Sequence, residues 1–316
     1  MDPLWLATIA ITALTAAHCT THRHSGDTQT GFTLLKLLLI VLFSAAALTL
    51  SPAEQHAPFE LDSEATALLG SGAFAVSLIY VNYAYSGWNA ATYISGELAA
   101  PQRSLPWVLG ISTAVVAALY CLLNFVFLSV APIEAMAGKV EVGVIAAEFA
   151  FGPRLGTFMG LLLALLLMST ISAMILAGPR VLHRIGQDYP RFTPLARENR
   201  DGIPVTAILL QSGTALAFLW TASFEQILVF SGATMALNTF ATVLGLFILR
   251  WRQPHLPRPF RVTLYPVTPL LFLGITGWTL TYVVLQRPVE ALISAGIVVS
   301  GGGFYWLVKP DRRLDL

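Results

Sequence analysis

The sequence predicts an all-α polytopic membrane protein, and three observations support this fold class. Hydrophobic residues make up 56% of the 316 residues and charged residues only 11%, whereas soluble domains carry roughly 25% charged residues. The mean hydropathy is +0.71. The apolar sequence suffices for about nine helices of roughly 20 residues, the length that crosses a hydrocarbon core of about 30 Å. A lipid bilayer is therefore the expected surrounding of the chain.

Nine apolar runs form the predicted spans. They are continuous rather than alternating, as residues 37–43 illustrate, and this favours helices over the strands of a membrane barrel. Lys36 is the one basic residue inside a run. In chain order the runs cover residues 4–17, 31–50, 66–96, 105–131, 156–179, 203–222, 226–249, 265–285 and 290–308.

The distribution of charge predicts the orientation. Fourteen of the eighteen Lys and Arg residues fall on one side of this nine-span topology, and the positive-inside rule makes that side cytoplasmic. We therefore expect a multi-pass protein of the cell (inner) membrane, with the N-terminus outside and the C-terminus in the cytoplasm. The net charge of +1 provides no basic surface for nucleic acid, and two cysteines cannot form a disulfide framework.

The third run is too long and too polar at its middle for a plain span. Residues 70–97 cover 28 positions, and the middle holds Asn82, Tyr83, Tyr85, Ser86, Gly87, Trp88 and Asn89. Unsatisfied polar groups in hydrocarbon cost several kcal/mol. The pattern favours a broken helix whose freed backbone groups face a small solute at mid-membrane. The alternative is a kinked helix whose polar groups bind only neighbouring helices.

Four segments carry a family resemblance. They are residues 83–106 with Tyr-Ala-Tyr-Ser-Gly-Trp-Asn at their start, residues 29–39, residues 177–188 with Ala-Gly-Pro-Arg, and residues 258–266 with Arg-Pro-Phe-Arg-Val. In order they resemble the sixth helix, the fifth helix, the end of the eighth helix and the loop before the eleventh helix of amino acid permeases. The superfamily is the amino acid/polyamine/organocation one, and the L-type branch with its bacterial relatives is the most similar. Along the chain the four motifs occur in the same order as in the family, and this makes the resemblance specific.

The resemblance implies a leucine-transporter-like fold, with two inverted repeats of five helices and two further helices. On that pattern residues 1–316 form a single transmembrane domain that starts at the fourth helix, so we expect an N-terminally truncated fold. Residues 1–50 are then a remnant of the first repeat (helices 4 and 5), residues 66–250 the second repeat (helices 6 to 10), and residues 265–308 the two C-terminal helices.

The resemblance also implies a substrate site at the break of the sixth helix, where the amino group of an amino acid is bound. The implied site residues are Tyr83 as a gating aromatic, Ala84, Ser86 and Gly87, with Trp88 and Asn89 shaping the pocket. The alternative for Tyr83 and Trp88 is that these aromatic side chains only fill space in the protein core. Glu97 and Arg180 are a candidate inner gate, although a solvated pair at headgroup level is an equal alternative.

Lys36 is the second functional candidate. A charge at the centre of a span costs roughly 2.5 to 3.5 kcal/mol and is usually functional. The resemblance implies that this ammonium replaces the cation of sodium-coupled relatives, donating to carbonyls of the broken first helix and to hydroxyls of the eighth helix. The alternative is a lysine that snorkels to the surface. Ser169, Thr170 and Ser172 lie mid-span, where such hydroxyls usually bond their own helix.

No cofactor, metal or enzymatic activity is predicted. His18, Cys19, His22 and His24 have a spacing compatible with zinc, but no second ligand pair is visible and a solvated loop is favoured. No histidine is expected inside a span, and no paired carboxylates appear within one. In the L-type branch the cysteine that links a heavy subunit precedes the fourth helix, so a disulfide-linked heavy subunit is not supported here.

The predicted function is transport of an amino acid by alternating access, without sodium, as exchange or proton-linked uptake. The alternative is a non-transporting truncated remnant or a membrane interaction subunit, and a membrane enzyme is a weak third. Since the resemblance places the carboxylate-binding half of the site in the first helix, we expect the chain alone to move no amino acid.

The orientation can be tested by labelling introduced cysteines with a membrane-impermeant thiol reagent, after Cys19 and Cys121 are replaced by serine. Cysteines placed in the loop at 52–64 should react from outside, whereas cysteines at 191–200 should not, because five basic residues hold residues 180–200 in the cytoplasm. The reverse labelling pattern would contradict the orientation.

Overall fold

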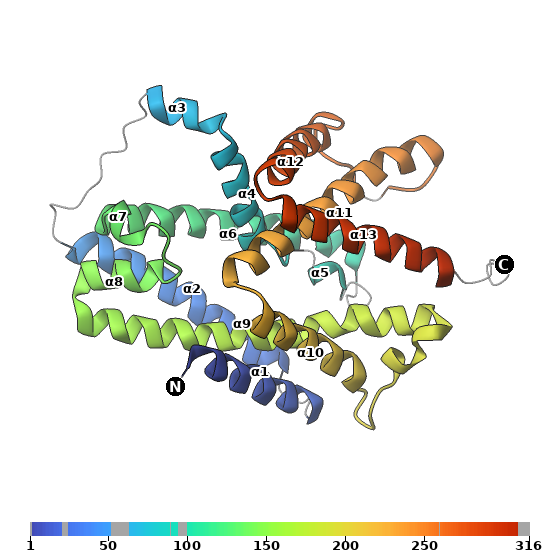
Figure 1. Ribbon diagram of the computed structural model, residues 1–316, viewed down its shortest axis with the longest axis horizontal. Helices are drawn as coiled ribbons and strands as arrows, with labels where there is room; N and C mark the ends of the chain where they lie inside the picture. Colours follow the sequence, from blue (N-terminus) through green and yellow to red (C-terminus); the bar gives the residue numbers. More distant parts are fainter. Residues whose placement is uncertain are drawn as a thin grey trace. The chain divides into compact units, whose positions relative to one another are not determined.

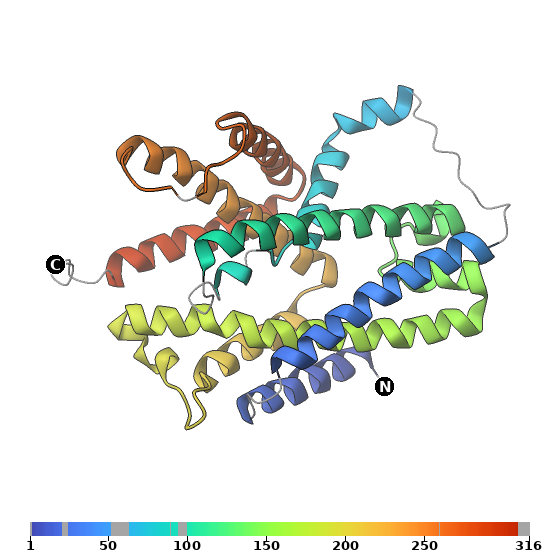
Figure 2. The same ribbon diagram turned by 180° about the vertical axis from the view of Figure 1, so that it is seen from behind.

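The protein is all-helical over the residues that its computed structural model describes, which are 2–20, 25–51, 63–88, 90–93, 100–258 and 260–308. Seven helices in these ranges are long and apolar enough to cross a membrane (Figures 1 and 2). They are α1 (Pro3–Thr20), α2 (Ser25–Leu50), α6 (Pro101–Val130), α9 (Pro153–Asp188), α11 (Phe224–Arg252), α12 (Val267–Gln286) and α13 (Pro288–Val308). The predicted polytopic helical fold is confirmed.

Two of the nine predicted runs differ from simple long spans. The run at 203–222 is α10 (Val205–Thr221), an apolar helix of 17 residues. The run at 66–96 is divided into α3 (Ser63–Leu69), α4 (Gly72–Ala84) and α5 (Ala90–Tyr93). The break between α4 and α5 lies in the predicted polar cluster, where polar side chains and glycine interrupt the apolar sequence. The break between α3 and α4, at Gly70 and Ser71, was not predicted.

The segment between α6 and α9 holds two helices that the hydropathy pattern did not predict. Residues 132–155 lie between two predicted runs, and they contain α7 (Ile133–Met136) and α8 (Val142–Phe151). Ten residues rise only about 15 Å, so α8 is too short to span a bilayer. Gly152, with a φ of +85°, reverses the chain so that α8 lies along the beginning of α9.

The chain forms two compact units. The first, unit 1, comprises residues 1–60, 110–188 and 192–216. Its main core packs α2, α6 and α8 together through residues that include Phe43, Val126 and Ala147. A second cluster, built around Ile175, Ile203 and Ile208, joins α9 to the beginning of α10 and to the end of α1.

Unit 2 comprises residues 61–109, 189–191 and 217–316. Its central helix is α11, which contacts α4, α12 and α13 (Figure 1). Ser223 begins α11 with a capping box, because its side chain accepts from the Gln226 amide and the Gln226 side chain accepts in return from the Ser223 amide. The core of this unit consists of Ile79, Ala233, Ala236 and Val283.

The longest helix, α9, has 36 residues and is therefore about 54 Å long, well beyond the roughly 30 Å of a hydrocarbon core. Pro179 lies inside it and cannot donate to the carbonyl one turn earlier. The side chain of Gln211 on α10 donates to the Met174 carbonyl at 3.0 Å. It fits there because Gly178 leaves room: a Cβ at that position would lie 2.1 Å from the Gln211 amide oxygen.

After α9 the chain turns back through η3 (Pro190–Ala196), and Gly186 allows the close approach. A Cβ built on Gly186 would lie 2.5 Å from the Ala196 nitrogen and 2.9 Å from the Phe192 oxygen. Both are backbone atoms, which cannot move aside as a flexible side chain could. The loop therefore packs directly on the last turns of α9.

Gly186→Ala should destabilise unit 1, because overpacking against fixed atoms costs roughly 1 to 3 kcal/mol. We expect the Tm of the purified protein to fall by about 2 to 10 °C in a thermal unfolding scan. The matched control is Gly213→Ala on α10, where a Cβ meets nothing within 4 Å. That variant should have an equal or higher Tm, since alanine favours a helix; an equal loss in both would contradict the role of Gly186.

Candidate functional site

The break between α4 and α5 contains the predicted substrate residues that the structure describes. Tyr83 and Ala84 end α4, and Ser86, Gly87 and Trp88 lie in the turn that follows. The Ser86 amide donates to the Tyr83 carbonyl at 3.0 Å, which ends the helical hydrogen-bond pattern. Gly87 has a φ of +94°, in the left-handed region that glycine adopts without strain.

The aromatic residues of this turn remain accessible. Tyr83 is 37% exposed and Trp88 is 51% exposed, so neither is part of the buried core of unit 2. Exposed aromatic side chains beside an interrupted helix can stack on or cover a small ligand. Asn89 and Glu97, two other predicted site residues, lie outside the described residues.

The position of α4 depends on its contact with α11. A Cβ built on Gly232 of α11 would lie 2.7 Å from Cγ2 of Ile79, 3.2 Å from the Ile79 carbonyl oxygen and 3.7 Å from Cβ of Tyr83. Gly232, Ala233 and Ala236 are buried on this side of α11. Small residues allow helix backbones to approach closely in membranes, and this contact holds the last turns of α4 next to the break.

A polar contact that the sequence analysis missed anchors α4 further. Glu225, in the first turn of α11, accepts from the Tyr80 hydroxyl of α4 at 3.4 Å and forms an ion pair with Arg287, which lies between α12 and α13. The acid is well placed at a helix N-terminus. Glu225 is 54% and Arg287 38% exposed, so the pair contributes about 1 kcal/mol or less. Because Tyr80, Glu225 and Arg287 lie far apart in the sequence, no local sequence pattern predicts their contact.

Lys36 lies in α2 and reaches α9. Its Nζ donates to Oγ1 of Thr170 at 2.9 Å, while the Thr170 hydroxyl donates to the Leu166 carbonyl at 3.2 Å. Thr170 thus bonds its own helix, as expected for mid-span threonines, and also accepts from the ammonium. The contact agrees with the expectation that Lys36 donates to hydroxyls of the eighth helix, while its role as a cation substitute stays a prediction.

A second polar contact joins α1 to α9. Nε2 of His18 lies 2.8 Å from Oγ of Ser172, and Thr15 donates to Ser212 of α10 at 2.8 Å. The prediction that His18 lies in a solvated loop was wrong, because α1 continues to Thr20 and turns this side chain toward α9. The apolar run ends one residue before His18, so the hydropathy pattern does not predict the last turn of α1.

The remaining predicted residues give no second site. Arg180 is half-buried on α9 directly after Pro179. No group of three His, Cys, Asp or Glu side chains that could hold a metal ion occurs within the described ranges. His22 and His24 lie outside those ranges. The break belongs to unit 2, whereas Lys36 and Arg180 belong to unit 1.

Comparison with known proteins gives consistent relatives. A family model described as amino acid permease matches residues 3–306. The large neutral amino acids transporter small subunit 2 of Mus musculus is 28% identical over 325 residues, which is 96% of this chain and 58% of that protein. The b(0,+)-type amino acid transporter 1 of Homo sapiens is 24% identical and covers 96% of this chain and 62% of its own length. The chain therefore spans somewhat more than half of these relatives.

The Lys36 contact predicts an effect of Thr170→Val on stability. This change keeps the shape of the side chain but removes the acceptor, and hydrogen bonds to charged groups contribute roughly 1.5 to 3 kcal/mol. Because Lys36 is partly exposed, we expect a loss of about 1 to 2 kcal/mol, or roughly 2 to 6 °C in Tm.

Thr214→Val is the matched control, since the Thr214 hydroxyl donates to the Leu210 carbonyl of its own helix. Its Tm should change less than that of Thr170→Val. Equal changes would mean that Lys36 is a snorkelling lysine with no stabilising partner on α9.

Proposed function

Because the chain belongs to the amino acid permease family, we propose that the protein transports an amino acid across the cell membrane by alternating access. The observation that carries the proposal is the interrupted helix α4–α5, at the position where the family resemblance puts the substrate. The relatives bear the names of amino acid transporters. An amino acid is accordingly the proposed substrate class.

The proposed binding groups are those of the break. The backbone leaves the regular helix after Tyr83 and Ala84, where the Tyr83 carbonyl accepts from the Ser86 amide. A carbonyl oxygen has two lone pairs, so carbonyls of this turn can in addition accept from an ammonium group. Ser86 adds a hydroxyl, Gly87 keeps the backbone accessible, and the exposed side chain of Trp88 is proposed to contact the substrate. The resemblance implies that Asn89 also shapes the pocket. Such an arrangement binds the amino end of the substrate and leaves the carboxylate to groups of another helix.

We propose that transport does not require sodium, because Lys36 supplies a fixed positive charge. Its fixed ammonium charge between α2 and α9 takes the place that a bound cation would otherwise occupy. Exchange and proton-linked uptake are both compatible with this arrangement. Glu97 and Arg180 remain the proposed inner gate.

The proposed topology has the N-terminus outside and the C-terminus in the cytoplasm. The orientation rests on the distribution of basic residues. Two contacts are compatible with the proposed sides, because each joins positions that the topology assigns to one side. Glu225 at the start of α11 pairs with Arg287 between α12 and α13, and the Asn199 side chain donates to the Cys19 carbonyl near the end of α1 at 3.4 Å. Cys19 and Cys121 are free thiols within α1 and α6.

A second candidate function is a non-transporting membrane subunit. One observation favours it, namely that the chain spans only 58% of the transporter small subunit 2 that it matches.

Uptake of radiolabelled L-amino acids into liposomes separates the two candidates. We expect no saturable uptake by residues 1–316 alone, and sodium-independent uptake when they are fused behind the first three helices of a relative. In the fusion, Lys36→Ala should slow uptake at least about tenfold, because a charged hydrogen-bond donor is lost. A correctly inserted fusion without uptake favours the second candidate, and uptake that requires sodium contradicts the role of Lys36.

Trp88→Ala in the same fusion should weaken uptake by about tenfold or more, as expected when a large aromatic contact is removed. Trp107→Ala is the matched control, because Trp107 is 72% exposed on α6 and outside the break. If both tryptophan variants transport as well as the parent, the aromatic residues of the break serve packing only.

A further inference from the structure

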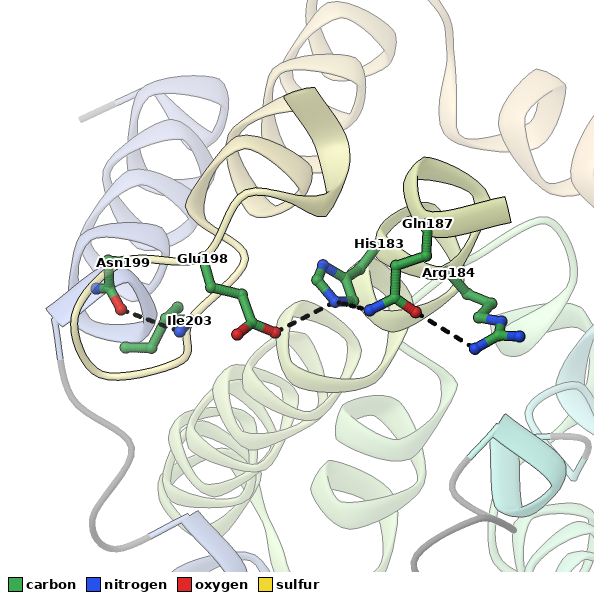
Figure 3. Close-up of polar contacts among 6 residues, drawn as sticks. All are labelled: His183, Arg184, Gln187, Glu198, Asn199 and Ile203. Carbon is green, nitrogen blue, oxygen red and sulfur yellow. Dashed lines mark hydrogen bonds and ion pairs between the residues drawn. The ribbon is translucent and has the colours of Figure 1, made fainter. Parts of the chain in front are cut away.

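The last turns of α9 and the loop that leads to α10 meet in a polar cluster (Figure 3). His183 lies at its centre with only 15% of its side chain exposed. Glu198 approaches from the loop, and Gln187 lies one turn further along α9. The sequence analysis assigned no role to this cluster, and the proposed transport mechanism does not use it.

Nε2 of His183 has two neighbours that require opposite protonation states. The Glu198 carboxylate oxygen lies 3.2 Å away and can only accept a hydrogen bond. The Gln187 amide nitrogen lies 2.9 Å away and can only donate. A ring nitrogen donates only when it carries a proton and accepts only when it does not. The two contacts therefore cannot both be hydrogen bonds at one time.

In the protonated state the ring binds the loop. The imidazolium Nε2–H donates to Glu198, and a charge-assisted hydrogen bond is roughly twice as strong as a neutral one. The Gln187 amide must then turn to present its oxygen to the ring. Its oxygen is the group that Arg184 contacts at 3.4 Å, so this contact is lost, while Arg184 keeps its ion pair with Asp188 at 3.1 Å.

In the neutral state the ring binds its own helix instead. With the proton on Nδ1, Nε2 accepts from Gln187, whose oxygen stays toward Arg184. Glu198 then faces a lone pair and loses its donor. The other neutral tautomer, with the proton on Nε2, leaves Glu198 only a neutral hydrogen bond and also requires the amide to turn.

The rest of the loop is held by contacts that do not titrate. The Asn199 side chain accepts from the amides of Asp201 at 2.9 Å and Ile203 at 3.0 Å, and Gly186 packs on the backbone of η3. Only the segment at Glu198 depends on the histidine. The charged and titratable groups on the described elements around His183 are His18 and Cys19 of α1, Arg180, Arg184 and Asp188 of α9, and Tyr189, Arg191, Arg197, Glu198, Arg200 and Asp201 of the loop.

We propose that His183 and Glu198 form a proton-dependent latch, which fastens the loop after η3 to the end of α9 when His183 is protonated and releases it when His183 is neutral. Histidine is the side chain that ordinarily changes charge between about pH 5 and pH 8, so the latch responds to cytoplasmic acidification in the proposed topology. The latch involves no substrate and does not rest on the proposed transport activity.

The test is electron paramagnetic resonance of a spin label at Arg197→Cys, next to Glu198, in the full chain with Cys19→Ser and Cys121→Ser. Between about pH 5.5 and about pH 8, the ratio of mobile to immobile signal should rise roughly threefold to tenfold, because a charge-assisted hydrogen bond is lost. His183→Gln and Glu198→Gln, which keep the side-chain shapes, should each abolish the change with pH.

His255→Gln is the matched control, since His255 is an exposed histidine of the loop after α11, and it should keep the full pH response. A response that persists in Glu198→Gln, or that is lost in His255→Gln, overturns the latch. Hydrogen–deuterium exchange of the unlabelled chain, corrected for intrinsic pH effects, provides a second measurement. Exchange at residues 197–200 should be faster at high pH, and equal protection at both pH values also overturns the latch.

Discussion

The structure depends on one constraint, which is that backbone N–H and C=O groups within hydrocarbon must be paired inside the protein. Long helices meet it without help, and seven helices of the described chain are of this kind. The regular helical pattern is interrupted at Pro179 of α9 and after α4. Near Pro179 the Gln211 side chain donates to the Met174 carbonyl, one residue before the carbonyl that loses its helical donor to the proline. At residues 85–88 the helix stops altogether, and that exception marks the proposed substrate site.

Features that depend on hydropathy and local composition could be predicted from the sequence. The long spans follow from continuous apolar runs, and the break follows from amide, hydroxyl and glycine residues inside such a run. The short helix α8 could not be predicted this way, because a largely apolar stretch of ten residues between two spans does not indicate whether the chain crosses the bilayer or folds back. Gly152 and the small Gly156, which allow the reversal, became informative only once α8 and α9 were seen together.

Most side-chain partners could not be predicted from the sequence. The family resemblance implied that Lys36 donates to hydroxyls of the eighth helix, and the Thr170 hydroxyl of α9 accepts from Lys36. Contacts of Glu225 with Arg287 and of His18 with Ser172 join residues 62 and 154 positions apart. Such pairs are determined by how helices pack, and a single sequence contains no record of that packing.

Pro179 gives α9 a mechanical property that its length alone would not suggest. Thr170, which binds Lys36, lies before the proline, and His183, which meets the loop, lies after it. A helix bends most easily where a hydrogen bond is missing, so Pro179 is the position at which α9 can bend between these two contacts. A change in angle there would move His183 and the loop while Thr170 kept its contact with Lys36.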